Sequence, residues 1–193
     1  MFKFIFSILT GLAICSTALA DKLPGNIAVH IAKIHYEHPV RLLHPYLDVW
    51  HMKGPLAEKV ALKTLTKRFV TVNMCSNSSK ADVVLLLEPQ MFYNAQLRVF
   101  HAEIIAKAFT NSTEPPTFYN AITTIKKQAQ QNGDLGIKPE FYMEKAYTKA
   151  MDKVIKKLET DKAFLAALNK SPPGKAETLC SPLDSLPVTK IYY

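Results

Sequence analysis

The chain has 193 residues and a formal net charge of +8, from 24 Lys and Arg against 16 Asp and Glu. Apolar residues make up 48% and charged residues 21%, which is typical of globular proteins and excludes a disordered or collagen-like chain. The length suits one domain with its own core. Because no GxSxG, HExxH, SxxK, Walker or GxGxxG motif occurs, we expect a non-enzymatic protein without a cofactor.

The first twenty residues have the layout of a secretory signal peptide. Lys3 supplies a positive charge, residues 5–14 are an apolar run, and residues 18–20 (Ala-Leu-Ala) fit the rule for signal peptidase. We therefore expect cleavage after Ala20 and, reading the signal as bacterial, a periplasmic location. Two alternatives stay open. The run could be a membrane anchor, although it is shorter than the roughly 20 residues that span a bilayer. Cys15 could be lipidated, although a bulky residue precedes it.

Export decides how the other cysteines are interpreted. Removal of residues 1–20 leaves Cys75 and Cys180, and two cysteines in an oxidising compartment predict a disulfide. The alternative is a pair of buried free thiols. The bridge would hold residues 171–193, which contain four prolines and no periodicity and are expected to form a C-terminal tail.

Between the signal and the tail, residues 21–170 are expected to form a single α/β domain. The predicted elements are, in chain order, strand 26–36, loop 37–53, helix 55–69, strand 70–75, strand 81–93, strand 96–109, strand 118–131, helix 139–158 and a short helical segment 161–168. Residues 96–109 also fit a helical spacing, and we favour a strand because short hairpin-like turns flank them. This order predicts a two-layer α/β sandwich: a mainly antiparallel sheet of about five strands with two helices packed on one face.

Histidines gather between residues 30 and 51. Zn²⁺ needs three or four converging N, S or O donors, and the candidate ligands are His35, His38, His44 and His51. Prolines follow two of these histidines and place them in extended or turn backbone, so solvated loop histidines are the favoured interpretation. Elsewhere, His101-Ala102-Glu103 matches half of the zinc deaminase signature, but the P-C-x-x-C half is missing.

Five lysines of the last long helix form a candidate face for an anionic partner: Lys145, Lys149, Lys153, Lys156 and Lys157. Export favours anionic lipid, lipopolysaccharide or cell-wall polymer over nucleic acid as that partner. We expect no nucleic-acid binding, because aromatic residues are not interleaved with these lysines. The alternative interpretation is a solvated helix face that aids solubility.

Four segments carry a resemblance to a known class of protein: Asn26–Lys33, the helix 55–69, the strand entry Ala81-Asp82-Val83-Val84-Leu85, and the amphipathic helix Ala146–Leu158. Their order over residues 26–160 resembles small periplasmic domains of bacterial envelope-assembly proteins. The class includes the amino-terminal domain of the Tol translocation protein TolB, the curli-secretion lipoprotein and the lipopolysaccharide-assembly lipoprotein. The resemblance implies a domain without catalytic residues that acts through protein contacts.

These observations lead to three functional hypotheses. The first is a non-enzymatic periplasmic protein that binds other envelope proteins as an accessory of a transport or secretion assembly, through a sheet edge or the basic helix face. The second is a carrier or sensor of a small amphipathic ligand held between sheet and helices. The third, less favoured, is a metal-dependent enzyme that uses the His30–His51 loop.

Overall fold

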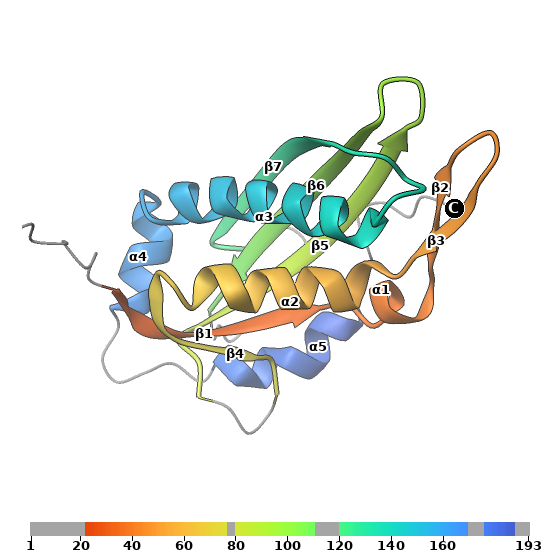
Figure 1. Cartoon of the computed structure of the whole chain (residues 1–193). Helices are drawn as coiled ribbons and strands as arrows, with labels where there is room; N and C mark the ends of the chain where they lie inside the picture. The colour runs from red at the N-terminus through yellow and green to blue at the C-terminus, as the bar shows by residue number, and fades with distance from the viewer. Residues whose placement is uncertain (1–21, 77–79, 111–119, 170–175, 188–193) are drawn as a thin grey trace, which may run out of the picture.

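A computed structural model describes residues 22–76, 80–110, 120–169 and 176–187 (Figure 1). Its centre is a five-stranded sheet with the strand order β4-β1-β5-β6-β7, and a separate hairpin pairs β2 with β3. The strands are β1 (Leu23–Ile31), β2 (Val40–Leu43), β3 (Asp48–His51), β4 (Phe69–Met74), β5 (Val83–Asn94), β6 (Val99–Phe109) and β7 (Thr123–Asn132). The helices are α1 (Ile34–Glu37), α2 (Lys53–Leu65), α3 (Pro139–Leu158), α4 (Lys162–Leu168), the 3₁₀ helix η1 (Ala176–Leu179) and α5 (Cys180–Asp184).

The α/β class is confirmed, but the sheet is mixed rather than mainly antiparallel. Strand β1 runs parallel to both of its neighbours, β4 and β5, whereas β5, β6 and β7 form an antiparallel meander. The parallel pair arises because the chain leaves β1, passes through α2 and returns as β4 in the same direction. Such a crossover connection is the usual route to a parallel pair.

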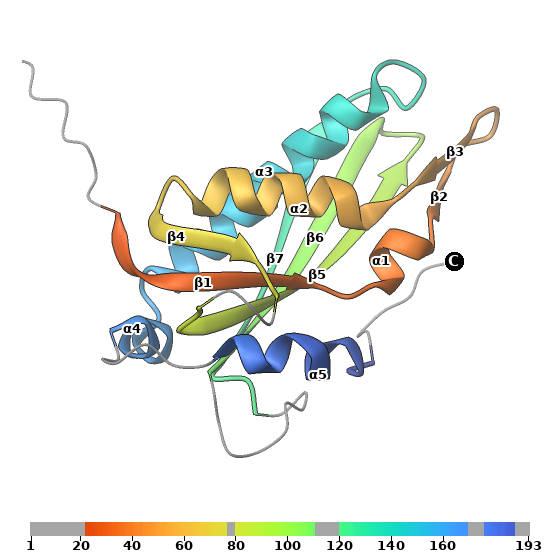
Figure 2. The same ribbon diagram turned by 90° about the horizontal axis from the view of Figure 1, so that it is seen from below.

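Helices α2 and α3 cover one face of the sheet, as Figures 1 and 2 show. Apolar residues of α2 and α3 pack there against every second residue of the strands, such as Ile27 and Val29 of β1. Glu144 of α3 ties the two helices together, because it accepts hydrogen bonds from Lys59 (2.8 Å) and Lys63 (3.0 Å) of α2.

The strands also bury residues on the opposite face, which we call the back face. Val84 and Leu86 of β5 point to it and pack with Leu179 of η1 and Leu183 of α5. Figure 2 shows α5 across the sheet from α2 and α3. The sequence predicted two helices on one face of the sheet, and η1 and α5 cover part of the other face as well. The continuous apolar run of Val83–Leu87 follows from this burial on both sides.

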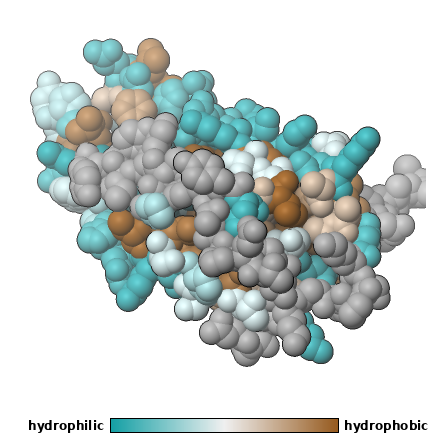
Figure 3. Space-filling view, turned by 180° about the vertical axis from the view of Figure 1, so that it is seen from behind, coloured by the Kyte–Doolittle hydropathy of each residue, from teal (hydrophilic) through white to brown (hydrophobic). Residues whose placement is uncertain are grey.

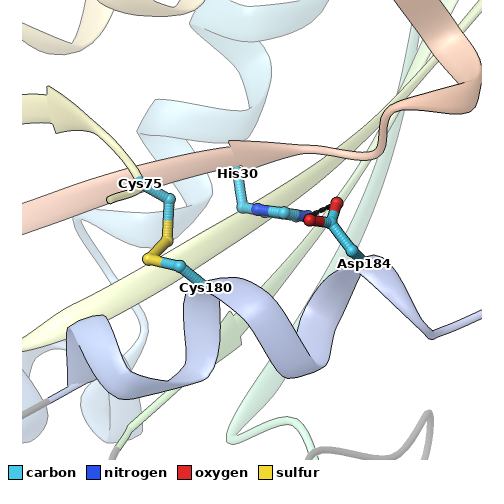
Figure 4. Close-up of a disulfide and its surroundings, with 4 residues drawn as sticks. All are labelled: His30, Cys75, Cys180 and Asp184. Atoms are coloured by element: carbon cyan, nitrogen blue, oxygen red, sulfur yellow. Dashed lines mark ion pairs between the residues drawn. A yellow bond between two sulfur atoms is a disulfide. The ribbon is translucent and has the colours of Figure 1, made fainter. Parts of the chain in front are cut away.

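The described part of the predicted tail, residues 176–187, is folded onto the sheet (Figure 4). The predicted disulfide joins Cys75, just after β4, to Cys180 at the start of α5. One turn later, Asp184 Oδ1 lies 3.2 Å from Nε2 of His30 in β1. The sequence predicted a tail that this bridge would hold to the domain. In the structure its described residues form η1 and α5, whose short apolar face packs on the back of the sheet.

In two further segments the structure differs from the sequence prediction. Residues 37–53, predicted as a loop, contain the β2–β3 hairpin, in which Val40 pairs with His51. The strand predicted for 26–36 ends at Ile31, and its last residues form α1. By contrast, the strand interpretation of 96–109 is confirmed by β6, and α3 has the predicted bounds. No helix in the described ranges is both long and apolar enough to span a bilayer.

The disulfide closes a separation of 105 residues. We expect the double variant Cys75→Ser/Cys180→Ser to lose about 2–5 kcal/mol of unfolding free energy, because the unfolded chain regains loop entropy. Urea unfolding of the oxidised protein and the variant measures this loss. Hydrogen exchange should accelerate most at residues 176–187. An unfolding free energy that is the same with and without the disulfide would contradict this expectation.

Candidate functional site

A pocket of about 840 Å³ opens on the back face, beyond the part that α5 covers. Its floor is formed by β5, β6 and β7, and the hairpin strand β2 forms one wall. The lining residues are Val40, Arg41, Leu43, Gln90, Met91, Phe92, His101, Ala102, Glu103, Gln128, Ala129, Gln130 and Lys153. Figure 3 views the molecule from behind and shows apolar and polar residues side by side on this face. Ligand sites commonly have this size and mixed lining.

The polar floor of the pocket follows from the period-two pattern of three neighbouring strands. His101 pairs with Gln130, and Glu103 pairs with Gln128, so their side chains share the back face. The glutamines also contact their partners: Gln128 Nε2 donates to Glu103 Oε2, and Gln130 Nε2 lies 3.3 Å from His101 Nδ1. Sequence reasoning missed this floor, although the polar run of residues 126–132, interrupted only by Ala129, carries part of its signal.

Two of the charged side chains that line the pocket form ion pairs, and a third has none with the residues that the structure describes. Glu103 forms an ion pair with Lys126 at 3.1 Å, and Arg41 pairs with Asp48 at 2.8 Å. Lys153 extends from α3 to the edge strand β7, where its Nζ donates to the main-chain oxygen of Gln128 at 2.8 Å. Among the described residues Lys153 has no carboxylate partner, so its positive charge dominates the mouth of the pocket.

A second feature is an apolar end of the molecule, at the side of the β2–β3 hairpin. Every exposed large apolar side chain among the described residues lies there except Val70 of β4. This apolar end consists of Leu43, Tyr46, Trp50, Met52, Phe92, Leu97, Ile137 and Phe141. Figures 1 and 2 show the β2–β3 hairpin, the β5–β6 turn and the start of α3 together at this end.

The structure separates the histidines that were candidate metal ligands. His35 and His51 are buried, whereas His38 is exposed and His44 lies beside the rings of Tyr46 and Tyr93. In the ranges that the structure describes, no group of three or more His, Cys, Asp or Glu side chains could hold a metal ion. The His101-x-Glu103 pair lies on the pocket floor.

The buried histidines surround a buried lysine. Lys53 Nζ donates to Gln90 Oε1 at 3.1 Å, and burial lowers the pKa of Lys53 to about 8. Burial, with a smaller effect from the Lys53 charge, lowers the pKa values of His35 and His51 to about 4. Both imidazoles are therefore neutral at pH 7.

The predicted lysine face is exposed, but it is only partly available to a partner. Lys149 and Lys153 donate to main-chain oxygens of Gln130 (3.3 Å) and Gln128 (2.8 Å), and Lys145 lies over the Phe141 ring at 4.2 Å. The first two contacts occupy carbonyl groups on the outer edge of β7. Lysines so placed protect an edge strand from pairing with another chain.

The comparison with solved structures shows what this chain is similar to in fold. No family model and no curated protein matches this chain. A crystal structure of a Xanthomonas campestris protein, assigned to the family model DUF330, has a TM-score of 0.47 and 12% sequence identity. The match covers 69% of this chain and 83% of that protein. The resemblance to envelope-assembly domains stays a prediction.

The buried histidines predict a dependence of stability on pH. Below pH 6.5 the unfolded chain binds protons at His35 and His51, but the folded chain takes them up only near pH 4. We expect the unfolding free energy to fall as the pH drops from 6.5 to about 4.5, by up to about 1.4 kcal/mol per pH unit for each histidine. Burial also lowers the pKa of His30, which adds to this trend.

Urea unfolding at several pH values measures the effect. The variant His51→Gln removes one titrating group and should give a shallower slope over the same range. A free energy that stays constant or rises as the pH falls from 6.5 to 4.5 would contradict the neutral, buried histidines.

Proposed function

We propose that this chain is a non-enzymatic, exported protein that binds another envelope protein through its apolar end. The signal sequence supports export, and the oxidised Cys75–Cys180 pair is the state that an oxidising compartment maintains. The observation that carries the proposal is the concentration of exposed apolar side chains at one end. Contiguous exposed apolar surface on a globular domain marks interaction sites.

The composition of this end favours a protein partner. Trp50, Tyr46, Phe92, Phe141 and Met52 belong to the residue types that are enriched in protein interfaces. The arginines near these residues have carboxylate partners: Arg41 pairs with Asp48, and Arg98 lies 3.7 Å from Asp134. The arginine charges at this end are therefore compensated, and the ammonium of Lys145 lies over the Phe141 ring at 4.2 Å. We infer a partner surface that is mainly apolar.

The sheet edge and the lysine face fit this role less well. Lys149 and Lys153 occupy main-chain oxygens of the β7 edge, which leaves fewer groups for a partner strand. Aromatic side chains at the apolar end give larger contact areas and lose little conformational freedom on binding. We therefore place the docking surface at the apolar end.

Site-specific photo-crosslinking in the native cells tests this proposal. A photoreactive phenylalanine analogue at position 97 or 137 should capture the same exported protein, whereas the analogue at position 70 should capture none. Val70 is the matched control, because it is exposed to a similar degree as Leu97 and Ile137 but lies on β4. The captured protein is then purified and its affinity measured.

We expect Trp50→Ala and Ile137→Ser to weaken that affinity at least tenfold each, the equivalent of about 1.4 kcal/mol. Val70→Ser should leave the affinity unchanged. Equal capture from positions 70, 97 and 137, or an affinity that does not respond to Trp50→Ala and Ile137→Ser, would overturn the proposal.

A further inference from the structure

Within the part of the chain that the structure describes, η1 and α5 cover one half of the back face, and the pocket lies on the other half. Near the start of β5, Val84 and Leu86 lie under η1 and α5. Further along the same strand, Gln90 and Phe92 face the pocket. The apolar cover formed by η1 and α5 thus ends where the polar floor of the pocket begins. The floor of the pocket is formed by side chains of the sheet strands and not by loops.

The side chains that line this pocket form two kinds of wall. Val40 and Leu43 from β2 and the half-exposed ring of Phe92 from β5 provide apolar surface. Gln128 and Gln130 from β7 provide carboxamides, each of which can both donate and accept hydrogen bonds. A ligand that uses both walls must have an apolar part and a polar head group.

The charge at the pocket selects the head group. Lys153 is the cation of the lining that has no carboxylate partner among the described residues, and it stands on the β7 side, next to Gln128. An anionic group placed there would face the ammonium of Lys153 and the amide groups of Gln128 and Gln130. The nearby Glu103 carboxylate, which accepts from Gln128, is paired with Lys126 at 3.1 Å. The net positive charge, +8 for the whole chain and +7 once the signal with Lys3 is removed, adds a long-range attraction for anions.

We propose that this pocket binds an anionic amphiphile, with its head group at Lys153, Gln128 and Gln130 and its apolar chain against Phe92, Leu43 and Val40. This site is distinct from protein docking at the apolar end, although Leu43 and Phe92 lie at the boundary between the two surfaces. The sequence had suggested a ligand between sheet and helices. The pocket lies instead on the opposite face, because the helix side is filled by the core.

Titration with three defined probes tests the ligand class. Decanoate is the anionic amphiphile, decyl maltoside has a similar chain with an uncharged head, and acetate has the charge without the chain. We expect decanoate to bind below its micelle concentration and at least tenfold more tightly than either of the others. Isothermal titration measures the affinity, and amide chemical shifts of residues 101–103 and 128–130 locate the site.

Two pairs of variants test the assignment to residues. Lys153→Gln should weaken decanoate binding about tenfold, and Lys149→Gln is its control because Lys149 makes the equivalent contact to β7 outside the pocket. Gln130→Trp should fill the pocket and abolish binding. Gln131→Trp, one residue along on the opposite face of β7, should not.

The proposal is overturned if decanoate does not bind, if decyl maltoside binds as tightly, or if Lys149→Gln and Lys153→Gln weaken binding equally. The last result would indicate a general attraction of anions to the helix. None of these variants changes a residue of the apolar end, so Lys153→Gln should bind the partner protein with unchanged affinity. A negative result for the pocket can therefore be distinguished from a negative result for the docking surface.

Discussion

The covalent link between Cys75 and Cys180 is the constraint on which the back of this molecule depends. It joins the end of β4 to the start of α5 and so fixes a five-residue helix that is too short to be stable alone. The helix then covers Val84, Leu86 and Phe109, which would otherwise be an apolar patch on an open sheet. Because α5 stops at Asp184, the other half of the back face is left to the pocket.

Buried polar groups fill the region where β1 ends and β5 continues. Beyond Leu87, β5 has no further pairing with β1, and the hairpin and the start of α2 take the place of a strand there. Lys53 reaches Gln90 across this junction, and Lys107 pairs with Glu88 at 2.7 Å. Breaking such a buried pair by removing one partner leaves an uncompensated charge, which makes these positions intolerant of single substitutions.

Local patterns predicted much of this fold. Pro139 gave the start of α3, the last residue of its apolar stripe, Leu158, gave its end, and β6 followed from short flanking turns. In the structure Asp161 caps α4 by accepting from the main-chain nitrogen of Phe164 (2.9 Å). Strand direction was not predictable in this way, because a strand's own sequence does not say which neighbour it pairs with. The hairpin was hidden by Pro39 and Pro45, which in the structure lie just outside β2 and β3.

The candidate sites were harder to predict than the elements. The histidine cluster was a pattern in sequence, and folding sends His35 and His51 into the interior while His38 stays exposed. The lysines of α3 were predicted as a face, but Lys149 and Lys153 turn to the β7 edge and only Lys153 reaches the pocket. The pocket itself depends on the register of three strands, and the apolar end depends on loops far apart in the chain. Neither property is contained in a local pattern.

We propose that the chain works outside the cytosol, in its oxidised form. The most direct test is the intact mass of the native protein, purified from its own cells without reducing agent. We expect a chain that begins at Asp21 and carries two hydrogens fewer than the reduced form, with Cys75 and Cys180 in one disulfide-linked peptide pair. A chain that retains Met1 and has both thiols free would contradict it.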